Sequence, residues 1–230
     1  MIPPAGLRFL TQLKRNNNRE WFQEHKQEFE DYLRAPMEAL TAELNATLAH
    51  AAPDYVTEPK KAIFRIYRDT RFSSDKTPYK THLGALFPKR GMAKLGCGSL
   101  YFHVAPNEVI VAGGVYFAEP KTLLSLRTHI ASRYEELQAI LKARPARTLC
   151  GELHGSALQR PPKGFPATHP AIELIKRKQW YYDVTLDAGE ASTPGFARLI
   201  ARHFLAMLPL VEFLNRGIPK PPRIREDNLR

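Results

Sequence analysis

The spacing of apolar residues along the chain changes at Pro59. Before this proline, apolar side chains recur every three or four residues, as in Leu40, Leu44 and Leu48, and this spacing predicts amphipathic helices. After Pro59 the apolar residues follow a period of two, which is typical of strands. Helices that come first and strands that follow do not alternate as the units of a parallel sheet do. We therefore expect an α+β fold with an antiparallel sheet.

The turn and cap residues place the individual elements. We predict a helix over residues 7–13, a second helix that begins after an Asn18 cap and a third that begins at Pro36. Further along the chain we predict a long amphipathic helix from Pro120 and a last helix capped by Thr193. We predict strands at residues 64–72, 82–87, 99–105, 108–117 and 180–186. The expected architecture is an antiparallel sheet of about five or six strands, with the N-terminal helices and the long middle and C-terminal helices packed on it.

The size and composition of the chain favour one globular domain. With 230 residues and 43% hydrophobic side chains, we expect a single domain over residues 1–217 and a basic, proline-rich tail over 218–230. The longest apolar run, residues 109–118, is too short to span a bilayer, and the N-terminus does not resemble a secretory signal. We therefore expect a soluble, cytoplasmic protein with no membrane partner. The sequence does not indicate its oligomeric state.

The histidines and cysteines show no pattern of metal ligands. None of the eight histidines forms an HxH, HxxxH or HExxH arrangement, and the two cysteines, Cys97 and Cys150, lack CxxC spacing. There is no P-loop and no glycine-rich dinucleotide motif. We expect no metal site and no cofactor.

Positive charge is concentrated in one part of the chain. The formal net charge is +11, and residues 60–94 hold ten Lys or Arg against two Asp. Such a local excess creates a field that attracts anions. The basic window can equally face the N-terminal helices and be neutralised there, because residues 1–59 hold nine acidic against six basic side chains.

The centre of this basic window raises a specific problem. If residues 64–72 form a strand, Arg68 shares a face with Phe64 and Phe72, which should point into the core. An arginine that faces a core must be paired or must line a polar cavity, because an unpaired buried charge costs several kcal/mol. Two interpretations stay open: the arginines bind an anionic ligand, or Asp69 and Asp75 tie them into ion pairs that stabilise the turn.

The first interpretation predicts a set of ligand-binding residues. We expect the guanidinium groups to surround a shared cavity, because arginine and lysine suit phosphate and carboxylate groups. The predicted ligand-binding residues are Arg65, Arg68, Arg71, Lys76, Tyr79 and Lys163. Asp69 and His82 are the candidates for acid or base chemistry, although the sequence names no reaction.

Part of this segment resembles a known family. The pattern Arg65-x-x-Arg68-Asp69-x-Arg71-Phe72-x-x-Asp75-Lys76-x-x-Tyr79 resembles the signature of the mainly bacterial family called domain of unknown function 2461. The segments "NNNREWFQEHKQEFE", "LQRPPKGFPATHP" and "HFLAMLPLVEFLN" are also similar to that family, so that the resemblance covers nearly the whole chain. It implies no reaction, substrate or cofactor.

Three functions remain compatible with the sequence. The preferred hypothesis is a pocket for a small ligand that carries phosphate or carboxylate groups, in an enzyme or a receptor. The alternative is a module that binds nucleic acid or another polyanion along an extended basic surface. The third is that the basic motif only stabilises the fold.

Overall fold

The structure, a computed structural model, describes residues 1–219 of the chain. The first part is helical, as predicted, and comprises α1 (Pro4–Arg15), α2 (Arg19–Glu24), α3 (Lys26–Phe29), a π-helical turn (Glu30–Arg34), α4 (Ala35–Ala51), a 3-10 turn (Pro53–Tyr55) and α5 (Pro59–Ala62). The side chain of Asn18 accepts a hydrogen bond from the N–H of Trp21 at 2.9 Å, which confirms the predicted cap of α2.

Four strands form one antiparallel sheet. They are β1 (Leu83–Pro88), β2 (Ser99–Val104), β3 (Glu108–Val115) and β4 (Trp180–Asp187), and they lie side by side in the order β1-β2-β3-β4. The antiparallel sheet and the positions of these four strands confirm the prediction. The predicted number of five or six strands is wrong.

The segment predicted as the first strand forms an irregular arm, residues 64–82. At its base, Ile63 and Tyr67 make only isolated bridges, to Ala85 and Tyr79. The N–H of Arg68 donates to the carbonyl oxygen of Pro78 at 2.9 Å, but Pro78 has no N–H with which to continue the ladder. The arm therefore folds back on itself without becoming a regular strand pair.

The remaining helices differ from the prediction in two respects. They are α6 (Pro120–Ser132), α7 (Tyr134–Lys142), α8 (Arg144–Leu149), α9 (Ile172–Ile175) and, after a 3-10 turn at Ala188–Ser192, α10 (Phe196–Arg216). The last helix has Gly195 and not Thr193 as its N-cap, because Thr193 ends the preceding 3-10 turn and its hydroxyl donates to the carbonyl oxygen of Glu190. The long middle helix is broken at Arg133, whose φ of −132° and ψ of 34° are not helical. The prediction of one continuous helix from Pro120 is therefore wrong.

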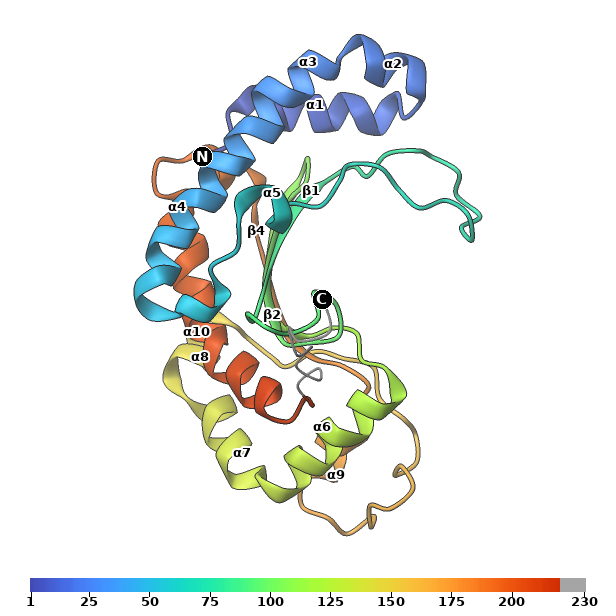
Figure 1. The fold of residues 1–230 in the computed structure, drawn as a ribbon, viewed down its shortest axis with the longest axis vertical. Coiled ribbons are helices and arrows are strands. Elements are labelled where there is room, and N and C mark those ends of the chain that lie inside the picture. The colour runs from blue at the N-terminus through green and yellow to red at the C-terminus, as the bar shows by residue number, and fades with distance from the viewer. Residues whose placement is uncertain (220–230) are drawn as a thin grey trace, which may run out of the picture.

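The two faces of the sheet have different surroundings. One face packs on α10, where Phe102 of β2 contacts Phe204 with ring centroids 6.4 Å apart, and α4, α6 and α7 pack in turn against α10. Figure 1 shows that the arm extends from one end of the sheet away from α10, and that α6, although it contacts α10, reaches out at the other end towards the same side as the arm. We call this second side the open face.

Two expectations concern the ends and the environment of the chain. Of the predicted tail, only Ile218 and Pro219 are described, and the rest lies outside the described residues. Within residues 1–219, no helix has the length and the apolar character needed to cross a membrane.

Candidate functional site

The predicted ligand-binding residues lie in different places. Arg65 lines a pocket of about 550 Å³ on the open face of the sheet. Arg68 and Tyr79 line a separate cavity of about 290 Å³ between the arm and α2. The prediction that the arginines surround one shared cavity is therefore wrong.

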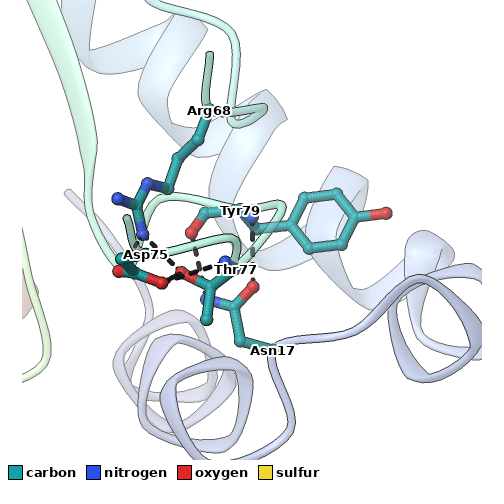
Figure 2. A network of polar contacts seen from close by, with 5 residues as sticks. All are labelled: Asn17, Arg68, Asp75, Thr77 and Tyr79. Atoms are coloured by element: carbon teal, nitrogen blue, oxygen red, sulfur yellow. Dashed lines mark hydrogen bonds and ion pairs between the residues drawn. The ribbon is translucent and has the colours of Figure 1, made fainter. Parts of the chain in front are cut away.

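Arg68 belongs to a network inside the arm (Figure 2). Its Nη1 donates to Oδ2 of Asp75 and to Oγ1 of Thr77. Asp75 also accepts hydrogen bonds from the backbone N–H of Thr77 at 3.0 Å and from its hydroxyl at 2.8 Å. The hydrogen bond from Arg68, with those from Thr77, lowers the pKa of Asp75 to about 2. Both arrangements expected for Arg68 are present, because it forms an ion pair with Asp75 and also lines the small cavity between the arm and α2.

Arg71 and Lys76 lie at the tip of the arm. Arg71 donates to both oxygens of Asp69, from Nε at 3.0 Å and from Nη2 at 2.7 Å, and these bonds lower the pKa of Asp69 to about 2. Lys76 donates to the carbonyl oxygen of Thr70 at 2.9 Å. Phe72, expected to face the core, is 95% exposed. Asp69 is thus the ionised partner of an arginine at the tip, away from the large pocket.

Tyr79 attaches the arm to the helical part. Its ring stacks on Phe22 with centroids 4.1 Å apart, and its backbone N–H and C=O both bind the side-chain amide of Asn17 at 3.0 Å. Figure 2 shows its ring directed away from the pair formed by Arg68 and Asp75. The role of Asn17 was missed from the sequence, although its position in "NNN" between two helices marks it as a loop residue.

Lys163 is far from these groups in the fold. It lies exposed in the loop between α8 and α9, next to Gly164, whose φ is 90°. Among residues 1–219 its side chain makes no hydrogen bond or ion pair. It lines neither the large pocket nor the small cavity.

The large pocket is shaped by rows of side chains across the open face. In one row, Leu86 of β1 pairs with Tyr101 of β2, Tyr101 pairs with Ala112 of β3, and Ala112 pairs with Asp183 of β4. The rows on either side contribute small residues and one histidine to the pocket wall: Gly84, Ser99, His103 and Gly114. Small side chains leave the sheet surface uncovered, and the hollow forms over them.

Tyr101 occupies the middle of the pocket because β1 leaves room for it. A Cβ atom at Gly84 would lie 2.7 Å from Oη of Tyr101, closer than real contacts allow. The hydroxyl of Tyr101 is 3.0 Å from Nδ1 of His103. Burial raises the pKa of Tyr101 to about 12, so the phenol stays protonated at neutral pH and serves as a hydrogen-bonding group.

Two histidines form part of the same wall. His82 and His103 lie with ring centroids 4.6 Å apart. Burial, followed by the nearby His103 and Lys80, lowers the pKa of His82 to about 4, and burial also lowers the pKa of His103. At neutral pH both rings are uncharged, and each imidazole can donate one hydrogen bond and accept another. His82, a predicted acid or base candidate, thus lies in the pocket wall.

The cations gather at the edge of the pocket beside β1. Lys80 and Lys94 lie over the ring of Phe64, with Nζ 5.2 Å and 5.0 Å from its centroid, and Arg65 lines the pocket next to it. Burial is the main cause that lowers the pKa of both lysines. Within residues 1–219, no carboxylate pairs with Arg65, Lys80 or Lys94. The ammonium groups of Lys80 and Lys94 donate instead to the backbone carbonyl oxygens of Arg65 and Lys61, at 3.1 Å and 2.6 Å. The positive charge at this edge of the pocket is therefore not neutralised by a carboxylate of the described chain.

Several pocket residues were missed from the sequence. Tyr101 and His103 are half-buried and alternate with buried neighbours along β2, and Asp183 is half-buried between the buried Tyr182 and the partly buried Val184 of β4. This alternation was visible in the sequence as polar positions within apolar strands. No pattern in the sequence around Lys94 marks it as a pocket residue, because Lys94 and Phe64 come together only in the folded protein. In residues 1–219 no group of three or more His, Cys, Asp or Glu is placed to hold a metal ion.

Comparison with known proteins agrees with the signature in the arm. No curated protein and no solved structure matches the chain. One family model matches residues 5–213, and its description is "Conserved hypothetical protein (DUF2461)". Because this match covers most of the chain, the protein belongs to the DUF2461 family.

Proposed function

We propose that the protein binds a small ligand, with a phosphate or carboxylate group and an apolar body, in the pocket on the open face. The observation that carries this proposal is a set of three cations near the ring of Phe64. They are Arg65, Lys80 and Lys94, and none has a carboxylate partner within residues 1–219. The proposal moves the anion site from the tip of the arm to its base beside the sheet, and Arg65 is the one predicted ligand-binding residue that it keeps.

The size and lining of the pocket support a small molecule. Its volume of about 550 Å³ lies in the range of ligand sites, roughly 300–1,000 Å³. The walls combine apolar surface with few polar groups, a lining that is typical of ligand sites. In such surroundings a charged hydrogen bond is less screened than in water, so that an anion at the cationic edge is held more strongly.

The charge pattern of the arm supports a small ligand over an extended polyanion. Arg68 and Arg71, which an extended basic surface would use, are already paired with Asp75 and Asp69. Paired cations offer little net charge to a nucleic-acid backbone. Of the cations of the arm that have no carboxylate partner within residues 1–219, Arg65 and Lys80 line the pocket and Lys76 lies at the tip.

A thermal-shift screen tests the proposal. The probes are phenyl phosphate and octanoate, and the matched uncharged probes are benzyl alcohol and octanol. A ligand that binds only the folded state stabilises the protein, and the gain in stability grows with the logarithm of the ratio of the ligand concentration to Kd. We expect the two anions to stabilise the protein at millimolar concentration and the two alcohols to have a smaller effect.

Charge-removing variants identify the site. Lys80→Met and Lys94→Met keep an unbranched apolar side chain and remove the ammonium group, and each should weaken binding about tenfold. Lys163→Met is the matched control, because it removes a lysine outside the pocket. If no anion stabilises the wild-type protein, or if Lys163→Met weakens binding as much as Lys80→Met, the proposal is wrong.

A further inference from the structure

We infer that the ligand is dipolar, with its anionic group at the cationic edge of the pocket and a protonated amine at Asp183. This inference rests on the proposed function and extends it to the opposite end of the pocket. The cationic edge is formed by Arg65, Lys80 and Lys94, and Asp183 lines the same pocket from β4.

The order of the strands separates the two charges. The cations stand beside β1, at one edge of the sheet, and Asp183 belongs to β4, at the other edge. Neighbouring strands lie about 4.8 Å apart, so that β1 and β4 are separated by about 14 Å along the sheet. Side chains that reach inward from both ends shorten the gap. A single small anion cannot touch both ends, whereas an elongated molecule can.

The position of Asp183 leaves its carboxylate available to a ligand. It pairs across the sheet with Ala112, whose methyl group does not cover it, and beyond Ala112 the same row continues to Tyr101. Burial is the main cause that raises the pKa of the neighbouring Tyr181, and the charge of Asp183 adds to it. The carboxylate thus adds negative charge to this end of the pocket.

The partner of Asp183 in the chain is a weak competitor for a ligand amine. Within residues 1–219 its one ion pair is with His154, whose Nε2 lies 3.5 Å from Oδ1, and an imidazole is charged only when protonated. Both side chains are partly exposed, and exposed pairs contribute little to stability. An ammonium group of a ligand can therefore replace or join His154 at the carboxylate.

The middle of the pocket constrains the body of the ligand. Between the charged ends lie the ring of Tyr101, the neutral imidazole of His103 and the side chains of Ile110 and Ala112. None of these carries a charge at neutral pH. An apolar chain or an aromatic ring fits these surroundings, so that the inferred order along the ligand is anion, apolar body, amine.

Matched pairs of carboxylates test the inference. The probes are hexanoate, octanoate and decanoate, each compared with the same acid bearing an amino group at its far end, and the measurement is isothermal titration calorimetry. We expect the amino form to bind at least about tenfold more tightly than the plain acid at one of these lengths, because an amine at a carboxylate makes a charged hydrogen bond. The Asp183→Asn protein should lose this advantage and keep its affinity for the plain acid.

The controls separate this inference from the proposed function. Asp187→Asn removes an acid from the same strand, outside the pocket lining, and should leave the advantage of the amino form intact. If plain acids bind but the amino forms bind no better, or if Asp183→Asn keeps the advantage, the inference is overturned and the anion site stands. If neither form binds the wild-type protein, the proposed function fails and the inference fails with it.

Discussion

Arg68 and Lys80 belong to the same basic segment, yet their surroundings give them different roles. Arg68 is bound to Asp75 and Thr77 within the arm, and Lys80 lies over Phe64 beside the pocket. Spacing along the sequence does not distinguish them, because both are cations in a polar stretch. The difference arises from where the arm turns and which carboxylates the turn brings close.

At the residue scale, removal of Arg68 should affect stability and not ligand binding. Arg68→Ala should lower the free energy of unfolding by about 1 kcal/mol, because it removes a partly exposed ion pair and the hydrogen bond to Thr77. Urea unfolding measures this change. The matched control is Arg71→Ala, whose pair with Asp69 is more exposed and should contribute less. Loss of phenyl phosphate binding in Arg68→Ala would contradict this division of roles.

The buried histidine predicts a dependence of stability on pH. The pKa of His82 falls from its ordinary 6.5 to about 4 on folding, so that between these values the unfolded chain binds a proton that the folded protein does not. Stability should therefore decrease as the pH falls from 6.5 towards 4. Urea unfolding at pH 7 and at pH 5 measures the decrease, which should be smaller in His82→Gln. An equal decrease in both proteins would show that other groups cause it.

At the element scale, the side chain of Asn17 is one of the contacts that hold the base of the arm, beside the stacking of Tyr79 on Phe22. Asn17 binds both backbone polar groups of Tyr79, and this contact joins the loop after α1 to a segment far along the chain. The alternation of apolar residues predicted the strands of the sheet, since β2 and β3 bury one face against α10. It failed for residues 64–72, where Pro78 lies opposite Arg68 and side chains take over the hydrogen bonds at the tip.

Asn17→Ala should loosen the arm and destabilise the protein. It removes two hydrogen bonds to a partly buried backbone, and we expect a loss of about 1–3 kcal/mol in the free energy of unfolding. Asn16→Ala is the matched control, because Asn16 makes one exposed side-chain bond to the end of α1. Hydrogen exchange of the amide of Tyr79 should rise in Asn17→Ala alone. Equal stability of the two variants would contradict the anchoring role.

At the scale of the whole molecule, the open face of the sheet unites residues that are distant in sequence. The cations come from the arm and from the β1–β2 connection, the central rings from β2, and Asp183 from β4. The α+β class could be predicted from apolar spacing alone. The pocket could not, because no local pattern shows that Lys94 reaches Phe64 or that Asp183 shares a row with Tyr101.

The overall charge leads to a prediction about salt. A net charge of +11 should give weak binding to single-stranded oligonucleotides at low salt, through the release of counterions, and this binding should fall steeply by physiological ionic strength. Phenyl phosphate held in a partly buried pocket is screened less, so its affinity should change little over the same range. Fluorescence anisotropy and calorimetry measure the two slopes. Oligonucleotide binding that is steeply salt-dependent yet still tight at physiological ionic strength, together with no binding of phenyl phosphate, would favour the polyanion alternative.

The most direct measurement is a crystal structure of the full chain with phenyl phosphate. We expect the phosphate to lie within hydrogen-bonding distance of Arg65 or Lys80, with the phenyl ring over the open face near Tyr101. A phosphate bound at the tip of the arm beside Arg71 and Lys76, with the pocket unchanged, would contradict it.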